Sequence, residues 1–223
     1  MVEYTIVRSK RKTTTIYVRD GIVEVRAPLD IPKRAIDHFV ATKEEWIKEK
    51  LNELRVQTEQ RQAFVLTYGV DILYRGSEYP VTVKDGDRIG FDGSVFYMPP
   101  NLVEEEIRDA CERIYRMLAK RDLTIRTIEL AKGMSVSPSD IKINGAKTRW
   151  GSCSARKSIN YSWRLIMAED YVIDYVIVHE LAHLIELDHS ARFWTVVEGI
   201  LPDYRERKAK LVALQNRLDA ENW

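Results

Sequence analysis

The amino-acid sequence predicts an α+β fold, and three observations lead to this prediction. Apolar and polar residues alternate in two stretches of the first hundred residues, as they do in half-buried strands. Much of the second half repeats its apolar residues every three or four positions, as helices with one buried face do. One helix near residue 180 is apolar on nearly every side, so it belongs in the middle of a domain. We therefore expect this helix to pack against a small antiparallel sheet, preceded by a β-rich N-terminal portion.

The overall composition is that of a globular protein with one or two domains. The chain has 223 residues, of which 45% are hydrophobic and 31% charged, and this length is enough to bury a core. No stretch approaches the roughly 18 to 20 uncharged apolar residues of a membrane span, and the N-terminus lacks the apolar core of a secretory signal. The two cysteines, Cys111 and Cys153, are far apart, which argues against a disulfide framework. We expect a cytoplasmic protein with no membrane partner.

The first hundred residues contain two β-rich stretches with a helical stretch between them. Residues 3–27 alternate in β fashion and predict a short meander, with a hairpin turn at Asp20 and Gly21. Between residues 31 and 60 the apolar period changes to three and four, which predicts two helices. Residues 70–98 return to strands, separated by turn signals that contain glycine. Together these stretches predict a small sheet with helices packed on it.

Two successive prolines, Pro99 and Pro100, mark the expected domain boundary, because each has a fixed φ and no N–H to donate. We therefore expect domains over residues 1–100 and 101–223. The second domain is expected to contain a helical stretch that breaks near Asp122, then a pair of strands, then helices only. The ranges are 102–132 for the helical stretch, 141–149 and 158–166 for the strands, and 171–187, 191–201 and 204–218 for the last helices.

Three polar residues, His179, Glu180 and His183, are set into the apolar helix at residues 170–187. Histidines four positions apart differ by about 400° of helical rotation and about 6 Å of rise, so both imidazoles leave one face and can bind one metal ion. Glu180 lies beside them, where a carboxylate can take the proton that a metal-bound water loses near neutral pH. The pattern H-E-x-x-H is that of the zincin peptidases. We expect Zn²⁺ as the cofactor and Glu180 as the catalytic base.

The motif is too rare to be a chance occurrence. With 4 histidines in 223 residues, composition alone predicts about 0.006 copies of the five-residue pattern. The alternative is that both histidines are hydrogen-bonded core residues. It would bury two imidazoles and a carboxylate together without a metal ion, at about 1 to 3 kcal/mol for each unpaired polar group. The sequence therefore favours the metal site.

A third ligand is expected from His189, ten residues after His179, which is the spacing of the metzincin pattern. A true metzincin is not expected, because Glu186 stands at the glycine position of that pattern and all five methionines precede the motif. The alternative third ligand is Glu198 on a later helix. If His189 is the ligand, the helix must end before it and the chain must turn back, and Asp188 is the residue best suited to a left-handed conformation there.

The last third of the chain carries motifs that resemble one known family. They are Arg149-Trp150-Gly151-Ser152-Cys153, Trp163-Arg164-Leu165, the histidine motif, Phe193-Trp194 and Pro202-Asp203-Tyr204. In these motifs residues 147–204 resemble the YgjP-like family of small metallopeptidases, which is related to the SprT-like and Wss1-like zinc proteases. The resemblance implies one zinc ion held by His179, His183 and His189, with Glu180 as the catalytic base. Ser162 departs from the asparagine expected at that position of the family.

The segment from Arg149 to Ser152 is the candidate for substrate binding. In zincins an edge strand above the active-site helix holds the substrate backbone in an extended form. Arg149, Trp150, Gly151 and Ser152 are the candidate residues, since Gly151 and Ser152 would permit a close approach. The alternative is that Trp150 is a core residue and that Gly151 and Ser152 form a turn. Ser152 and Cys153 are disfavoured as nucleophiles, because neither has an identified base or a nucleophile elbow.

Three other features have competing interpretations. Tyr204 either stabilises a tetrahedral oxyanion through its phenol or packs in the core. His38 stands alone and is interpreted as a partly exposed helix residue. A basic cluster near the N-terminus would suit nucleic acid, but a solvated hairpin routinely carries such clusters, and the net charge of +1 gives no further support. The cluster consists of Arg8, Lys10, Arg11 and Lys12.

We therefore predict a zinc-dependent hydrolase. The favoured hypothesis is a metallopeptidase that acts on polypeptides. A first alternative is a divalent-metal hydrolase of nucleoside triphosphates, although the sequence has no glycine-rich phosphate loop. A second alternative is a non-catalytic interaction module in which zinc only holds the fold. That module would have no use for Glu180 beside the first ligand.

Overall fold

The computed structural model describes residues 2–19 and 21–223. It divides into two compact units, one of residues 1–64 with 219–222 and the other of residues 65–218 with 223. We call them the first and the second unit. The division falls between Phe64 and Val65 and not at Pro99-Pro100, where the sequence suggested a boundary. Among the described residues, no helix combines the length and the apolar composition that crossing a bilayer requires.

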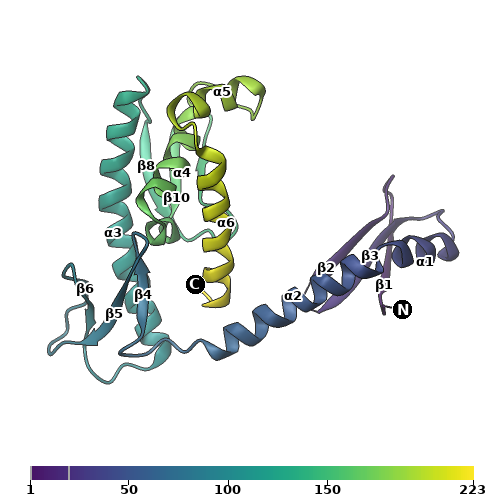
Figure 1. The fold of residues 1–223 in the computed structure, drawn as a ribbon, viewed down its shortest axis with the longest axis horizontal. Helices are drawn as coiled ribbons and strands as arrows, with labels where there is room; N and C mark the ends of the chain where they lie inside the picture. The colour runs from purple at the N-terminus through teal and green to yellow at the C-terminus, as the bar shows by residue number, and fades with distance from the viewer. Residues whose placement is uncertain (1, 20) are drawn as a thin grey trace. The chain divides into compact units, whose positions relative to one another are not determined.

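The first unit holds a three-stranded sheet and two helices (Figure 1). Its strand order is β1-β3-β2, in which β2 and β3 are antiparallel and β1 and β3 are parallel. The expected meander is therefore wrong for β1, which does not pair with its neighbour in sequence. Asp20 of the expected hairpin turn lies outside the described residues. The elements are β1 (Thr5–Ser9), β2 (Thr15–Arg19), β3 (Ile22–Pro28), α1 (Lys33–Thr42) and α2 (Glu44–Ala63).

The core of this unit follows from the alternation in β3. Val23, Val25 and Ala27 lie on one face of the strand and are fully or almost fully buried. They cluster with Ile36 and Val40 of α1 and with Ile47 of α2. The apolar residues that alternate along β3 and those that recur every three or four positions along α1 and α2 thus form one apolar layer.

The second unit begins with a four-stranded sheet and a long helix. The strand order is β4-β5-β7-β6, and the strands are β4 (Asp71–Tyr74), β5 (Ser77–Val83), β6 (Gly90–Phe91) and β7 (Phe96–Met98). The helix α3 (Glu104–Gly133) is continuous, so the expected break near Asp122 is wrong. The Asp122 carboxylate accepts a hydrogen bond from the Tyr74 hydroxyl at 2.6 Å, so this polar residue serves a tertiary contact instead of ending the helix.

A second sheet and four more helical segments complete this unit. Strand β10 runs parallel to β8 and antiparallel to β9, in the order β8-β10-β9, so the sheet is mixed and not antiparallel as expected. The α+β class is confirmed. The elements are β8 (Asp140–Asn144), β9 (Gly151–Cys153), β10 (Ser158–Ser162), the 3-10 helix η1 (Trp163–Met167), α4 (Asp170–Ala182), α5 (Ala191–Ile200) and α6 (Tyr204–Ala220).

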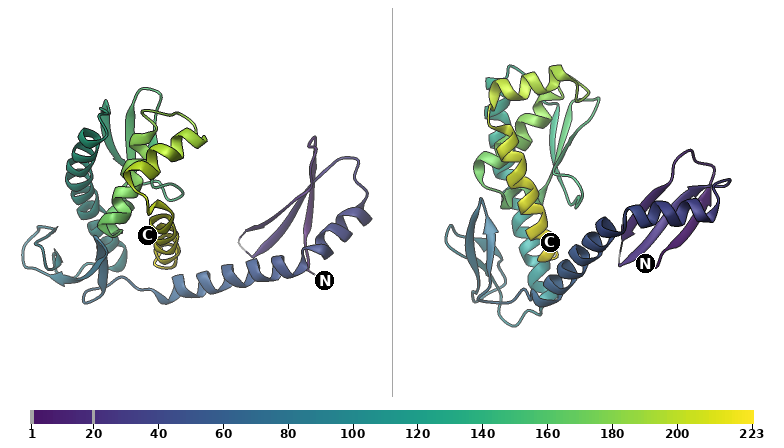
Figure 2. Two further views of the ribbon diagram at one scale, coloured as in Figure 1. Left: turned by 45° about the horizontal axis from the view of Figure 1, so that its top comes forward. Right: turned by 45° about the vertical axis from the view of Figure 1, so that its right-hand side comes forward.

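Helix α4 lies inside this unit, as its apolar sequence requires. It packs against α3, α5 and strand β9. Helix α3 also contacts β8, so it lies along the sheet formed by β8, β10 and β9 (Figures 1 and 2). On the central strand β10, Ile159 and Tyr161 are fully buried, and the Tyr161 hydroxyl lies 3.2 Å from the Thr127 hydroxyl of α3. The strand order leaves β9 at an edge of the sheet, beside α4.

Candidate metal centre

Helix α4 ends three residues after His179, and this ending shapes the site. Its last helical residue is Ala182, and His183 is the C-cap. The Ala182 carbonyl accepts the N–H groups of Ile185 at 3.0 Å and Glu186 at 2.9 Å, which closes the final turn. The helix is thus shorter than the expected 170–187, and the chain turns back before α5 begins at Ala191.

The reversal does not need a left-handed residue. No residue from 183 to 189 has a positive φ, so the conformation expected for Asp188 is wrong. Asp188 contributes through its side chain instead, because its Oδ1 accepts the backbone N–H of Ser190 at 3.0 Å. Ser190 occupies the N-cap position of α5 without a side-chain capping bond. A short Asx-type turn therefore returns His189 toward α4.

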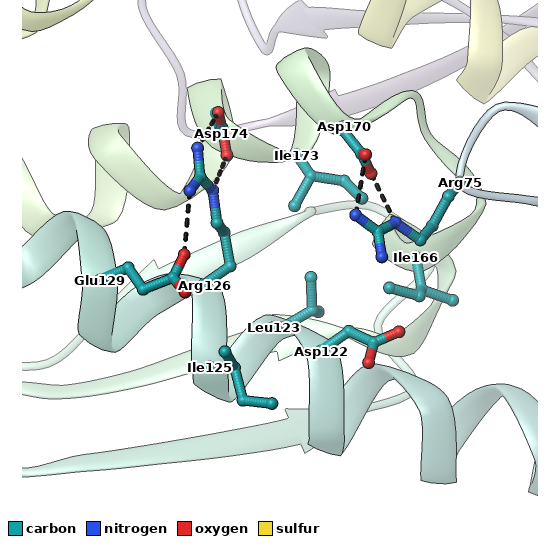
Figure 3. A pocket seen from close by; sticks show the side chains of 10 residues that line it. All are labelled: Arg75, Asp122, Leu123, Ile125, Arg126, Glu129, Ile166, Asp170, Ile173 and Asp174. Atoms are coloured by element: carbon teal, nitrogen blue, oxygen red, sulfur yellow. Dashed lines mark hydrogen bonds and ion pairs between the residues drawn. The ribbon is translucent and has the colours of Figure 1, made fainter.

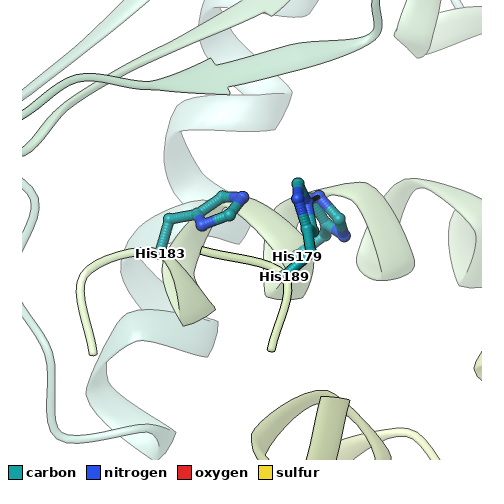
Figure 4. Close-up of side chains that lie close together, drawn as sticks. All are labelled: His179, His183 and His189. Carbon is teal, nitrogen blue, oxygen red and sulfur yellow. Dashed lines mark hydrogen bonds between the residues drawn. The ribbon is translucent and has the colours of Figure 1, made fainter. Parts of the chain in front are cut away.

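The three histidines converge (Figure 4). One ring nitrogen from each of His179, His183 and His189 lies within 4.8 Å of the other two. The Nε2 atoms of His179 and His189 are 3.1 Å apart, and Nδ1 of His183 lies 3.2 Å from the Glu186 carbonyl oxygen. Glu198 is not in this group, since its carboxylate pairs with Arg205 at 3.1 Å. The structure therefore brings His189, and not Glu198, to the two motif histidines.

The donor set fits a divalent metal ion such as zinc. Nitrogens bound to one tetrahedral zinc at about 2.0 to 2.1 Å lie roughly 3.3 to 3.4 Å from each other, close to the separation of His179 and His189. Burial lowers the pKa of His179 from 6.5 to about 4, with further lowering by the two other histidines and Lys208. Burial also lowers the pKa of His183. Both imidazoles are therefore neutral at pH 7, which is the form that binds a metal ion.

Glu180 is buried beside the histidines, with 5% of its surface exposed. Burial raises the pKa of its carboxyl from 4.5 to about 7, against the opposing charge of Arg149. Strand β9 passes directly over it, because a Cβ on Gly151 would lie 2.6 Å from Oε1 of Glu180. Only glycine leaves room for this approach. The carboxyl group is thus shielded from solvent, and its raised pKa allows it to gain or lose a proton near neutral pH.

The open edge of β9 presents backbone groups next to Glu180. The Trp150 carbonyl accepts the Ser162 N–H at 2.8 Å, and the Ser154 N–H donates to the Ser158 carbonyl at 2.9 Å. Residue 152 lies opposite Asn160, midway between these two pairs. Because inward and outward residues alternate in an antiparallel ladder, the N–H and C=O groups of residues 151 and 153 point to the open edge.

Buried polar contacts hold the loop that precedes β9. The Ser162 hydroxyl, on a residue with 1% of its surface exposed, donates to the Ala146 carbonyl at 2.7 Å. The Asn144 side chain accepts the Ala146 N–H at 3.0 Å, and the Arg164 guanidinium donates to the Gly145 carbonyl at 3.0 Å. The motifs of the sequence did not predict this role of Arg164, although an arginine within the apolar run 163–167 is a signal for it. The loop carries Arg149, whose charge acts on Glu180.

Two other candidate residues have structural surroundings that the sequence left open. Tyr204 is buried and stacks on Trp194, with ring centres 5.2 Å apart, which favours the packing interpretation. Burial, and then the charge of Glu180, raises the pKa of the Cys153 thiol, so it stays protonated at neutral pH and is no nucleophile. Tyr175 lies one turn before His179, with ring centres 6.0 Å apart, and is a neighbour of the site that the motifs did not predict.

In the first unit, part of the N-terminal basic cluster has structural partners. Arg8 donates to the carbonyl oxygens of Pro28 at 3.0 Å and Ile31 at 2.7 Å. Arg11 donates to the Thr15 hydroxyl at 2.7 Å. The segment is not a hairpin, because β1 pairs with β3 and not with β2. The bonds give Arg8 and Arg11 structural partners and add nothing in favour of nucleic acid.

A hollow of about 470 Å³ lies between α3 and α4, and none of the three histidines lines it (Figure 3). Arg75 makes two bonds to Asp170 at 2.6 and 2.8 Å, and Arg126 makes two bonds to Asp174 at 2.6 and 2.7 Å. Since both guanidinium groups are used in pairs that join α4 to its neighbours, we interpret this hollow as structural.

The family model and the solved structures that are similar to this chain are those of metallopeptidases. The model of the YgjP-like metallopeptidase domain family matches residues 12–213. Two solved structures of metallopeptidase zymogens are similar to part of the chain. Pyrococcus abyssi abylysin is 21% identical over 41% of this chain and 92% of its own, with a TM-score of 0.39. Methanocaldococcus jannaschii jannalysin is 19% identical over 42% of this chain and 96% of its own, with a TM-score of 0.38.

No curated protein matches the sequence. The family match alone covers most of the chain, including every residue of the candidate centre. The chain belongs to the YgjP-like family of metallopeptidases.

Proposed function

We propose that this metallopeptidase is a zinc enzyme, in which His179, His183 and His189 hold one zinc ion and Glu180 is the catalytic base. One observation carries the proposal: three imidazole nitrogens converge within 4.8 Å next to a buried carboxyl group. Three nitrogen ligands leave a fourth position for water or substrate, as in catalytic zinc sites. When bound, the ion would lower the pKa of a water molecule and polarise the carbonyl of a peptide bond.

The residues of the chain supply the proton transfer and the positioning. Glu180 accepts the proton of the attacking water and returns it to the leaving amine, and a pKa near 7 suits both steps. The outward backbone groups of Gly151 and Cys153 would pair with an extended substrate, with Arg149, Trp150 and Ser152 in the same segment. We assign Tyr204 to packing beneath Trp194 and not to oxyanion stabilisation.

The experiment combines metal analysis with one substitution. Protein purified without chelators should contain about one zinc per chain. Glu180→Gln keeps the size of the side chain and removes the base. We expect it to retain zinc and to lose about 100-fold or more of the turnover of an unfolded protein substrate. Turnover at the parental rate would exclude Glu180 as the base, and loss of zinc from the variant would make it a ligand or a support.

The same preparation distinguishes the two alternatives. Hydrolysis of nucleoside triphosphates without peptide cleavage would favour the nucleotide hydrolase. Zinc binding with neither activity would favour the non-catalytic module. Peptide cleavage that a chelator abolishes and zinc restores is the result that we expect.

A further inference from the structure

Helix α6 places a lysine at the rim of the metal centre. Tyr204 and Lys208 are one helical turn apart, so they share a face of α6. Tyr204 stacks on Trp194, and Nζ of Lys208 lies 5.9 Å from the centre of the same indole ring. The Trp194 ring centre is 5.9 Å from that of His179 and 6.0 Å from that of His189. The same indole ring thus lies near the ammonium group of Lys208 and near two of the histidines.

Two arginines close to Lys208 on α6 form ion pairs. Arg205 pairs with Glu198 at 3.1 Å. Arg207 pairs with Asp203 at 2.9 Å. In the part of the chain that the structure describes, Lys208 makes no ion pair with an acidic side chain, and it is exposed. Its charge is therefore available to a group that enters the site from solvent.

Two exposed cations lie near the centre. The ammonium group of Lys208 lies beside the indole ring that neighbours His179 and His189. Arg149 stands two residues before Gly151, the residue whose backbone approaches Glu180. Positive charge from α6 and from the loop before β9 therefore favours a substrate with negative charge near the scissile bond.

We infer that Lys208 forms a substrate subsite that binds a carboxylate of the polypeptide, close to the bond that is cleaved. This inference rests on the proposed peptidase function and extends it to a substrate class. The carboxylate has two sources, an aspartate or glutamate side chain or the free C-terminus. An ammonium group serves either source as a point charge with three donors.

The test uses the zinc-loaded full chain and matched fluorogenic peptides. Glu, Gln or Lys is placed in turn at each of the positions around the scissile bond, and each peptide has either a free or an amidated C-terminus. We expect kcat/KM for the best Glu peptide to exceed that of its Gln counterpart by about tenfold. Lys208→Ala should abolish this preference, and Lys208→Glu should turn it toward the Lys peptide. A preference that depends only on the free C-terminus would identify that carboxylate as the ligand.

Lys210→Glu is the matched control, because it makes the same charge change two positions along α6. Lys210 lines a different hollow, together with Met167 and Val172. We expect the Glu-to-Gln ratio of this variant to stay parental. An equal change in both lysine variants would indicate a general effect of net charge and would overturn the subsite. A wild-type enzyme that cleaves Glu and Gln peptides equally would overturn it as well.

A binding measurement keeps the inference separate from the peptidase proposal. In the Glu180→Gln background, labelled Glu peptides should bind more tightly than Gln peptides, and Lys208→Ala should remove the difference. Added salt should weaken the difference, as expected for a partly exposed charge pair. Binding with this pattern but without cleavage in the parent would contradict the peptidase function and support the subsite. Equal binding of both peptides would contradict the subsite.

Discussion

Phe193 shows how single residues build the centre. Its ring is fully buried, and its centre lies 4.9 Å from that of His179, 4.5 Å from His183 and 4.8 Å from His189. One aromatic side chain therefore packs against all three candidate ligands and restricts their orientations. Metal-binding side chains need such packing, because a loosely held ligand spends little time in the geometry of coordination.

The assignment of the third ligand predicts unequal effects of two substitutions. His189→Ala removes one of the three converging nitrogens and should weaken zinc binding by at least about 100-fold. Glu198→Ala removes only an exposed partner of Arg205 and should leave zinc affinity nearly unchanged. Competition with a chromophoric chelator measures both affinities. Strong loss of zinc from the Glu198 variant would contradict the assignment.

The buried carboxyl of Glu180 predicts a pH-dependent stability difference. Because its pKa is raised from 4.5 to about 7, the folded metal-free protein holds this proton more tightly than the unfolded chain does. Stability from this group is therefore lost as the pH rises from 4.5 to about 7. Glu180→Gln, which cannot ionise, should be more stable than the parent at about pH 8, by up to about 3 kcal/mol.

Near pH 5 the difference in unfolding free energy between Glu180→Gln and the parent should shrink. Urea unfolding of chelator-treated protein at both pH values measures it. The histidine titrations are common to both proteins, so they cancel in the comparison. A stability difference that stays constant between the two pH values would show that the carboxyl is not desolvated in the folded state.

At the scale of the elements, strand β9 combines two tasks. One side of its backbone is bonded to β10, and the other side is an open edge beside α4. Natural proteins usually protect such edges, because an open edge can pair with other chains. Here the edge lies over a buried carboxyl, and the loop before it is fixed by Ser162 and Arg164. This arrangement suits pairing with a substrate backbone.

The alternation along β9 predicts which backbone donor the substrate uses. Cys153→Pro removes an outward N–H and should weaken binding of an extended peptide by about tenfold or more. Cys153→Ala keeps that N–H and is the matched control, with affinity near the parental value. Peptide binding is measured by fluorescence anisotropy in the Glu180→Gln background, with circular dichroism as the check on folding.

Proline at position 152 should act differently, because the N–H of Ser152 points toward Asn160 in the protein's own sheet. We expect Ser152→Pro to lower the melting temperature more than Cys153→Pro does. Unchanged peptide affinity in a folded Cys153→Pro variant would exclude this edge as the binding site.

At the scale of the whole molecule, all residues of the candidate centre belong to the second unit. This unit includes the four-stranded sheet before Pro99, which is bonded to α3. The Tyr115 hydroxyl donates to the Leu73 carbonyl at 2.6 Å, and the Phe96 and Tyr115 rings lie 5.3 Å apart. The prolines therefore lie inside a packed unit and do not separate two of them.

This division predicts the behaviour of two fragments. A fragment of residues 65–223 should fold cooperatively and bind one zinc ion. A fragment of residues 101–223 should not, because it exposes the buried face of α3 around Tyr115 and Leu118. Calorimetry and zinc analysis of both fragments check this expectation. Cooperative folding of the shorter fragment would support the boundary at Pro99-Pro100 instead.

The sequence by itself determined how the residues of the histidine motif are arranged. His179, Glu180 and His183 stand at fixed helical offsets, so local geometry alone places them together. The position of His189 required that the helix end before it, and α4 does end at Ala182. The motifs of the last third also pointed to the family that the comparison shows.

The tertiary structure alone decided which strands pair and what surrounds the ligands. Alternation along β1 or β8 marks a strand, but it does not say that each runs parallel to a strand further along the chain. The approach of Gly151 to Glu180 and the bond from Ser162 to Ala146 likewise join elements that are distant in sequence. The physical reason is that helical offsets are set by local backbone geometry, whereas pairing and burial depend on how all the elements pack at once.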